Sequence, residues 1–130
     1  MKNNHHDIFR DDLWSLTSYN SEGPDSFTAV VKFNTRHRIF DAHFPESPVV
    51  PGACILQITT ELMSHHLSLP VIMKEARNIK FTSIINPLHH NEVEFSFRIS
   101  DADAGSKDAS VTVSSGTTVF VKISARFGKA

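Results

Sequence analysis

Only one stretch of this 130-residue sequence has the pattern of a helix, and apolar residues occupy most sides of its first half. The stretch runs from Gly52 to about Ser68, and Pro70 prevents it from continuing further. Its main apolar residues are Ala53, Cys54, Ile55, Leu56, Ile58 and Leu62. A helix that is apolar nearly all round is buried rather than laid on a surface. A single buried helix therefore predicts a curved sheet that wraps around it.

Alternation of apolar and polar residues indicates strands over much of the remaining chain. The expected strands cover residues 13–19, 27–33, 76–85 and 93–99, and both sides of a hairpin turn at 114–117. Residues 34–51 contain three prolines and no periodicity, which predicts a loop. Strands on both sides of one helix indicate an α+β fold with an antiparallel sheet. Such a sheet leaves an edge strand, and because two edges commonly pair across a twofold axis, we expect a homodimer.

Length and charge limit the classes of function. Residues 1–130 fit one domain, in which the polar residues 1–7 are expected to be poorly ordered. The formal net charge of -1 argues against a nucleic-acid partner. No apolar run is long enough to span a bilayer and no signal peptide is visible, so we expect no membrane association and a cytoplasmic location.

Histidines and the single cysteine do not indicate a metal or a cofactor. His89 and His90 lie in a predicted turn without Cys, Asp or a further His at metal-binding spacing, so no metal site is expected. His65 and His66 are interpreted as a solvated helix end, where an imidazolium would suit the helix dipole. Cys54 lies in the apolar helix run and is expected to be a buried structural thiol.

The loop that leads into the helix carries His43 and can support chemistry. Pro48 and Pro51 fix backbone dihedrals and stiffen the loop, and Pro51 suits the first positions of the helix. Gly52 would let a substrate approach the backbone, where first-turn N–H groups without helical partners attract an oxyanion. A thioester carbonyl held there would have acidic α-protons. Neutral His43 is a suitable base for one of them, because its ordinary pKa of about 6.5 is near working pH.

Two motifs resemble one enzyme family. His43-Phe44-Pro45, Pro48 and Pro51-Gly52 resemble the active-site signature of the hot-dog fold 3-hydroxyacyl-[acyl-carrier-protein] dehydratases, which serve fatty acid synthesis. The segment Arg77–Phe81, followed by Ile84–Pro87, is similar to the strand and turn that follow the helix in that family. With the order of strands, the resemblance covers roughly residues 40–127.

This resemblance implies a long central helix wrapped by an antiparallel sheet, and a dimer with an acyl tunnel at its interface. It also implies acyl carrier protein as partner, substrates linked to phosphopantetheine, and syn removal of water from a (3R)-hydroxyacyl thioester. By the same resemblance, His43 is the base, and the N–H groups of Gly52 and His43 form the oxyanion site. Pro51 belongs to the same substrate-binding segment, and Phe44 could line the tunnel. No cofactor is expected.

One position departs from the family pattern. The family carries Glu or Asp fourteen residues after the histidine, to protonate the leaving hydroxyl, and this chain has Gln57 there. An amide can bind the hydroxyl but cannot hand over a proton, and loss of a general acid costs about 10²–10⁴-fold in rate. Glu61 lies one helical turn further on, about 6 Å along the axis, and is the better substitute. Asp41 and Glu46 flank the histidine and are interpreted as solvated loop charges.

Three functions stay open from the sequence. The first is a dehydratase of fatty acid, polyketide or aryl-polyene synthesis; the second is a thioesterase in which Glu61 activates water. The third is a non-catalytic subunit that pairs with an active relative in a heterodimer or a higher oligomer. Six basic residues could form a rim for an acidic carrier protein, although spread surface charge is the preferred interpretation: Arg36, His37, Arg38, Lys74, Arg77 and Lys80. Phe81, Phe95 and Phe97 are expected to belong mostly to the core.

Overall fold

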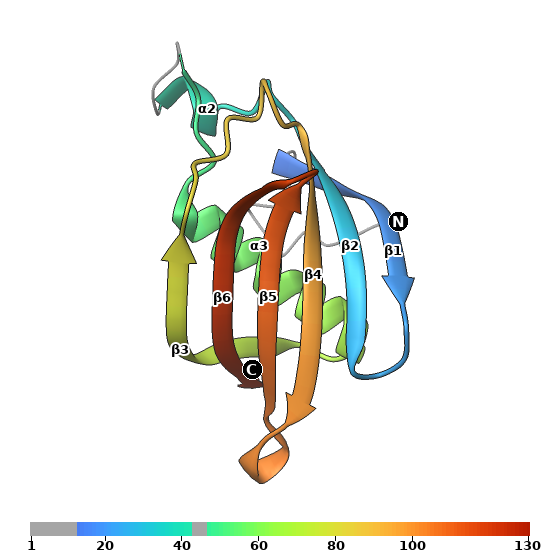
Figure 1. The fold of residues 1–130 in the computed structure, drawn as a ribbon. Helices are drawn as coiled ribbons and strands as arrows, with labels where there is room; N and C mark the ends of the chain where they lie inside the picture. Colours follow the sequence, from blue (N-terminus) through green and yellow to red (C-terminus); the bar gives the residue numbers. More distant parts are fainter. Residues whose placement is uncertain (1–12, 43–46) are drawn as a thin grey trace.

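The computed structural model describes residues 13–42 and 47–130, which form a six-stranded antiparallel sheet with a helix across one face (Figure 1). The elements are β1 (Trp14–Ser21), β2 (Ser26–Phe33), α2 (Ile39–Ala42), α3 (Gly52–Leu67), β3 (Val71–Phe81), β4 (Glu92–Asp101), the short 3₁₀ turn η1 (Asp103–Gly105), β5 (Lys107–Ser115) and β6 (Thr118–Lys129). The strand order is β1-β2-β4-β5-β6-β3, so β1 and β3 are the edges. The antiparallel sheet that the sequence predicts is confirmed.

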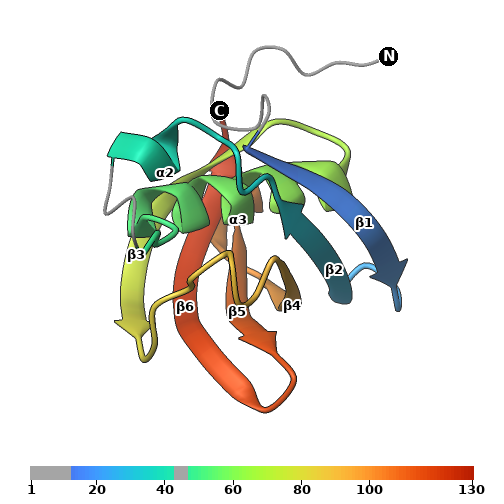
Figure 2. The ribbon, with the colours of Figure 1, turned by 90° about the horizontal axis from the view of Figure 1, so that it is seen from above.

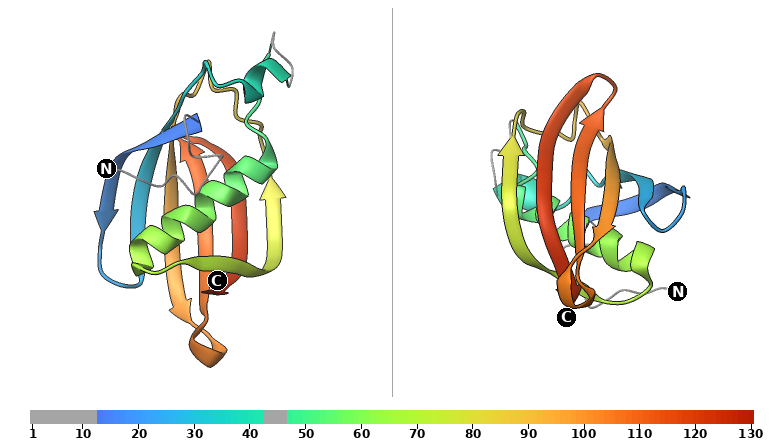
Figure 3. Two further views of the ribbon diagram at one scale, coloured as in Figure 1. Left: turned by 180° about the vertical axis from the view of Figure 1, so that it is seen from behind. Right: turned by 60° about the horizontal axis from the view of Figure 1, so that its bottom comes forward.

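The sheet is curved, and α3 lies on its concave side (Figure 2). Seen from behind, the helix runs diagonally across this face (Figure 3). Within the described residues, no helix combines the length and the apolar content that crossing a membrane requires.

Alternating residues of the strands build the core against this helix. In β2 the predicted apolar face, Phe27, Ala29, Val31 and Phe33, is buried. The matching face of β4 is buried too, and Phe27 stacks on Phe97 with 4.2 Å between ring centroids. Each fully buried side chain of this size contributes about 1.5–3 kcal/mol of transfer free energy. The period-two pattern therefore predicts both the strands and their orientation.

Helix α3 begins and ends at local signals. Pro51 is its N-cap with extended backbone, at φ -62° and ψ 146°. At the other end, Ser68 takes the left-handed conformation with φ 59°, and the Leu69 N–H donates to the Ser64 carbonyl at 3.2 Å. This closing arrangement satisfies carbonyls that the helix leaves unpaired.

Burial of α3 is one-sided within this chain. The residues that are buried are Cys54, Ile55, Ile58, Thr59, Leu62 and Met63. Leu56, Gln57, Thr60 and Glu61 are only partly buried, and Ala53 is exposed. The expectation of burial on most sides is therefore wrong for a single chain, because the sheet covers one side of the helix only. Burial raises the pKa of the Cys54 thiol, which keeps it in the unreactive thiol form typical of a structural cysteine.

Strand β3 differs from its predicted boundaries. It covers Val71–Phe81 rather than 76–85, and residues 82–91 form a loop. Register shifts between Met73 and Glu75, and between Ala76 and Asn78, interrupt its pairing with β6. The other edge strand has a similar shift between Leu16 and Ser18. Such shifts break the two-residue alternation on which strand prediction depends. The predicted loop at 34–51 also contains one short helix, α2.

His66 is not the solvated residue that the sequence suggested. Its Nδ1 lies 2.6 Å from the Tyr19 hydroxyl, and its Nε2 lies 3.1 Å from the Pro24 carbonyl. Because a carbonyl only accepts, Nε2 donates to it, and in the neutral imidazole Nδ1 accepts from the Tyr19 hydroxyl. The imidazole also stacks on Phe27 at 4.3 Å. His66 thus ties the end of α3 to β1 and to the turn before β2, whereas His65 is exposed as predicted.

Candidate functional site at the start of α3

The start of α3 presents backbone donors. The N–H groups of Cys54 and Ile55 both donate to the Pro51 carbonyl, at 3.0 and 3.2 Å. The N–H groups of Gly52 and Ala53 have no acceptor among the described residues, and no side chain caps the helix. First-turn donors of this kind, at the positive end of the helix dipole, favour an oxyanion.

An apolar hollow of about 240 Å³ opens beside these donors. It is lined by Val49, Val50, Pro51, Gly52, Ile55, Phe81, Ser83, Ile84 and Ile85. Ser83 is the one polar side chain in this lining, which contains no charged residue. A bond of 2.9 Å from the Val50 N–H to the Ile85 carbonyl holds the two sides together. The hollow thus combines residues of both motifs that carry the family resemblance.

The tip of the Phe81 ring lies against Gly52. A Cβ added at Gly52 would be 3.0 Å from Cζ and 3.3 Å from Cε1 of that ring, which is closer than ordinary contact. A side chain at position 52 would therefore require the ring of Phe81 to shift, a contact that the sequence did not suggest. Phe81 itself is 53% exposed, so the expectation that it belongs to the core is wrong. It ends an edge strand, where no further strand of the described residues pairs beside it.

Gln57 and Glu61 meet on the partly buried side of α3. The Gln57 Nε2 donates to the Glu61 Oε2 at 3.0 Å. A carboxylate accepts only, so the amide NH₂ must face it, and the amide Oε1 is left to accept from another group. Neither residue is among those that line the hollow.

The remaining predicted site residues divide into two groups. His43, Phe44 and Glu46 lie outside the described residues. Asp41 is exposed in α2, as its interpretation as a solvated charge requires.

The basic residues of the predicted rim have different roles. Arg77 pairs with Asp108 at 3.3 Å, and Arg126 holds both oxygens of the same carboxylate, at 2.8 and 3.2 Å. The hydrogen bond from Arg126, followed by the charges of Arg126 and Arg77, lowers the pKa of Asp108. His37 Nδ1 accepts from the Ile39 N–H at 3.0 Å and so caps α2. Of the six residues of the predicted rim, His37 and Arg77 thus have side chains with hydrogen-bond partners within the chain.

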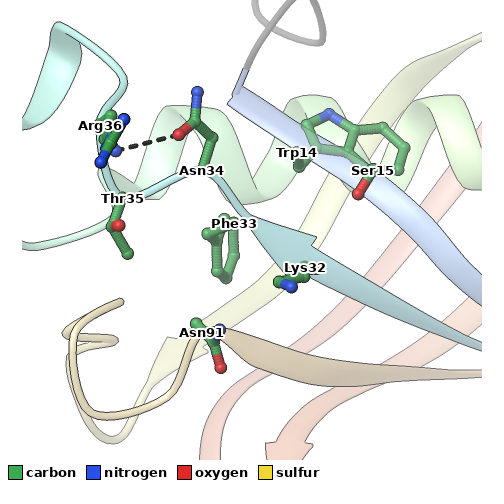
Figure 4. A pocket seen from close by; sticks show the side chains of 8 residues that line it. All are labelled: Trp14, Ser15, Lys32, Phe33, Asn34, Thr35, Arg36 and Asn91. Carbon is green, nitrogen blue, oxygen red and sulfur yellow. Dashed lines mark hydrogen bonds between the residues drawn. The ribbon is translucent and has the colours of Figure 1, made fainter.

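A second hollow, of about 490 Å³, lies where β1 and β2 meet the following loop (Figure 4). Trp14 and Phe33 line it together with the exposed cations Lys32 and Arg36. The Arg36 N–H donates to the Asn34 Oδ1 at 3.0 Å, which fixes the turn after β2. This hollow contains none of the predicted site residues.

Comparisons with known proteins agree with this architecture. A family model described as ApeI dehydratase (ApeI-like) matches residues 19–117. The structure of the dehydratase heterocomplex ApeI:P from Xenorhabdus doucetiae has a TM-score of 0.70 at 11% identity, and covers 88% of this chain and 97% of that chain. An uncharacterized protein from Erwinia carotovora subsp. atroseptica has a TM-score of 0.64 at 16% identity, covering 90% of this chain and 97% of that one.

A mutant thioesterase from Pseudomonas aeruginosa is also similar in fold. Its TM-score is 0.60 at 13% identity, and the match covers 84% of this chain and 77% of the thioesterase. Comparison with curated proteins gave no significant match. At such identities the likeness to solved structures concerns the fold alone.

Proposed function

Because the chain belongs to the ApeI-like dehydratase family of hot-dog proteins, we propose that it removes water from a (3R)-hydroxyacyl thioester carried by acyl carrier protein. The observation that carries the proposal is the start of α3, where the Gly52 N–H has no acceptor among the described residues and adjoins an apolar hollow. The donors suit a thioester oxygen, and the uncharged lining suits an acyl chain.

The proposed reaction begins with the thioester oxygen accepting from the Gly52 N–H. Negative charge that develops on this oxygen is stabilised there, which acidifies the α-carbon. Neutral His43 takes the α-proton, and the electrons of that C–H bond form the new C=C bond as the bond to the β-hydroxyl breaks. The hydroxyl leaves as water after it receives a proton. His43 then returns its proton to solvent.

The proton for the leaving hydroxyl needs a donor, and Gln57 cannot supply it. We assign Gln57 to binding the hydroxyl through its Oε1, because its NH₂ is engaged by Glu61. Glu61 is the proposed donor: it gives a proton to the leaving hydroxyl and afterwards regains one from solvent, which balances the proton that His43 releases. This assignment retains the two-residue arrangement of the family, with the acid displaced by one helical turn.

The proposed unit is one hot-dog domain, residues 1–130, that works as a homodimer in which each site is built from His43 of one copy and the helix of the other. Support comes from the open side of α3 and from β3, whose residues after Val71 are exposed or only partly buried. A partner that covers this region would make α3 the long central helix of the complete assembly. A relative could replace the second copy, since the ApeI structure with a similar fold is a heterocomplex. Acyl carrier protein as partner and the cytoplasm as location stay predictions from the sequence.

The test is turnover by the purified protein. It should interconvert 3-hydroxyacyl and trans-2-enoyl thioesters, which absorbance of the enoyl thioester follows directly. His43→Ala should abolish this activity, whereas the control His89→Ala, in an exposed turn, should retain it. Robust turnover by the His43→Ala variant would refute the role of the imidazole.

Thioester hydrolysis is the second candidate, favoured by the partly buried position of Glu61 beside Gln57. In this reaction Glu61 would take a proton from water while the water oxygen attacks the carbonyl carbon, and would then return that proton to the sulfur as the C–S bond breaks and the thiol leaves. Release of free thiol that depends on Glu61 would choose this function. Formation of enoyl thioester without free thiol would dismiss it.

A further inference from the structure

The hollow of about 490 Å³ lies at the border of the sheet that is opposite to β3. Three parts of the chain form it: the start of β1, the end of β2 with the turn that follows, and Asn91 just before β4 (Figure 4). The strand order places β1 and β3 at opposite edges, so this hollow lies away from the strand that the proposed dimer covers. The hollow is therefore a feature of each single copy.

Positive charge dominates this hollow. Among the described residues that line it, Lys32 and Arg36 are the charged ones, and both are exposed. Neither forms an ion pair with a carboxylate of the described residues. Glu92 is the cross-strand neighbour of Lys32, but it does not line the hollow and does not pair with the lysine. Two cations without a counter-charge attract an anion.

Neutral donors and a fixed backbone complete the hollow. Its other polar side chains are two amides and two hydroxyls: Ser15, Asn34, Thr35 and Asn91. The Phe33 N–H donates to the Asn91 carbonyl at 2.7 Å. The Asn34 N–H donates to the Leu13 carbonyl at 2.7 Å, and the Asn34 Oδ1 accepts from the Arg36 N–H at 3.0 Å. These bonds hold the lining segments in place, so a ligand binds at little cost in ordering of the backbone.

We propose that this hollow binds a phosphate group. A guanidinium group donates two parallel hydrogen bonds to a phosphate, and an ammonium group adds a compact positive charge. A phosphate group has more acceptor oxygens than a carboxylate, so it engages Lys32, Arg36 and a neutral amide together. The absence of a carboxylate from the described lining leaves nothing there to repel it.

Two sources supply this chemistry: the phosphodiester of a pantetheine arm, and a free phosphorylated metabolite. The first source rests on the proposed function, because it concerns the same substrate. Loop 82–91 runs along one end of the sheet from β3 to β4 (Figure 1). It contributes Ile85 to the apolar hollow and Asn91 to this one. Six residues span at most about 22 Å, and a pantetheine arm carries its phosphate and its thioester at opposite ends of an extended chain.

Melting curves test the site without any need for activity. Wild type, the double variant Lys32→Gln with Arg36→Gln, and a control with Arg98→Gln and Lys122→Gln are heated with phosphopantetheine or with sodium chloride at equal ionic strength. Both control residues are exposed cations outside the lining. At ten times the dissociation constant, phosphopantetheine should raise the melting temperature of the wild type and the control by about 4 °C. The double variant at positions 32 and 36 should lose this shift. Inorganic phosphate, as a second probe, should act in the same direction.

Kinetics then identify the source of the phosphate. The same three proteins are assayed with one straight-chain 3-hydroxyacyl group carried on pantetheine and on phosphopantetheine. If the arm is the source, the ratio of kcat/KM, phosphopantetheine over pantetheine, should fall about tenfold in the double variant at positions 32 and 36, as expected for loss of a hydrogen bond to a charged group. The control should keep the ratio of the wild type.

The outcomes separate this proposal from the proposed function. Shifts in melting temperature that are absent, or equal in all three proteins, would overturn the phosphate site and leave the dehydratase function standing. A shift that only the double variant at positions 32 and 36 loses, with an unchanged kinetic ratio, would support the site and assign it to a free phosphorylated metabolite. Failure of the wild type to turn over either thioester would overturn the function, and the melting curves alone would then decide on the hollow.

Discussion

Gln57 donates a hydrogen bond of 3.0 Å from its amide Nε2 to the Oε2 of Glu61, one turn further along α3. Pairs at this spacing stabilise a helix by only about 0.2–0.5 kcal/mol. The larger effect of this pair is on orientation. The carboxylate of Glu61 holds the amide NH₂ of Gln57, so the amide oxygen faces away from it. Position 57, where the family resemblance implies an acid, therefore presents an acceptor to its surroundings, and the carboxyl group stands at position 61.

Removal of this carboxyl group should remove the proton donor. We expect Glu61→Gln to lower the rate of dehydration by about 10²–10⁴-fold, which is the usual contribution of a general acid. The measurement is enoyl thioester formation at saturating substrate. Glu94→Gln, an exposed position on β4, is the matched control. Full activity of Glu61→Gln would show that the proton comes from another group.

Restoration of an acid at position 57 tests whether the native chain lacks one. We expect Gln57→Glu to increase the rate of dehydration, because it returns a carboxyl group to the position that the resemblance implies. Two adjacent carboxyl groups also raise the pKa of one of them, which favours a protonated donor. The same assay measures the rate. An unchanged or lower rate would show that the amide is part of a working site.

The contact of Gly52 with Phe81 should appear as coupling between their mutations. Gly52→Ala places a Cβ 3.0 Å from Cζ of the ring, so we expect the half-exposed ring to shift by a few tenths of an ångström at a small cost in unfolding free energy. In the Phe81→Ala background this cost should largely disappear. Urea unfolding of the wild type, both single variants and the double variant measures it. Additive costs would mean that the ring does not oppose a side chain at position 52.

The bond between Tyr19 and His66 should contribute to stability. Tyr19→Phe removes the hydroxyl that donates to the imidazole, and we expect a loss of about 0.5–1.5 kcal/mol. His66→Ala should cost more, since it also removes the bond to Pro24 and the stacking on Phe27. Urea unfolding measures both losses. A Tyr19→Phe protein as stable as the wild type would contradict the assignment.

The carboxylate of Asp108 should stabilise the fold in a pH-dependent way. Bonds from Arg126 and Arg77 favour its charged form, so its pKa in the folded protein lies below the ordinary value of about 3.9. The contribution of Asp108 to the unfolding free energy is therefore complete above the pKa that this carboxyl group has in the unfolded chain. It is lost as the pH falls through the lower pKa of the folded protein. Asp108→Asn should be less stable than the wild type at pH 7, and the difference should shrink in acid. Unfolding curves from pH 7 to pH 2.5 test this, and a difference that does not vary with pH would contradict it.

Short sequence patterns predicted the bounds of helix α3 and the buried face of strand β2. Pro51, Gly52 and Pro70 delimit α3 within one residue, and the alternation in β2 predicts which side chains are buried. The predicted start of β3 was wrong because register shifts interrupt the alternation of apolar and polar residues along this strand. No local pattern could join His66 to Tyr19, which is 47 positions away.

Only those parts of the candidate site that depend on local sequence patterns were predicted. The Pro51-Gly52 start of α3 and the Ile84–Pro87 segment share one hollow, as the two motifs of the resemblance would require. The pairing of Gln57 with Glu61 follows from helical spacing. The contact of Phe81 with Gly52 depends on how β3 ends beside α3, which no pattern in the sequence encodes. The assignment of His43 and Phe44 stays a prediction, since both lie outside the described residues.

Both borders of the sheet are irregular, with a shift at Leu16 and Ser18 in β1 and two shifts in β3. A flat and continuous border would let copies add to one another without limit, as they do in amyloid fibres. At these borders an incoming strand could pair in register for only a few residues, because the shifts displace the hydrogen-bonding groups of the border strand. These shifts therefore work against open-ended growth of the sheet into filaments.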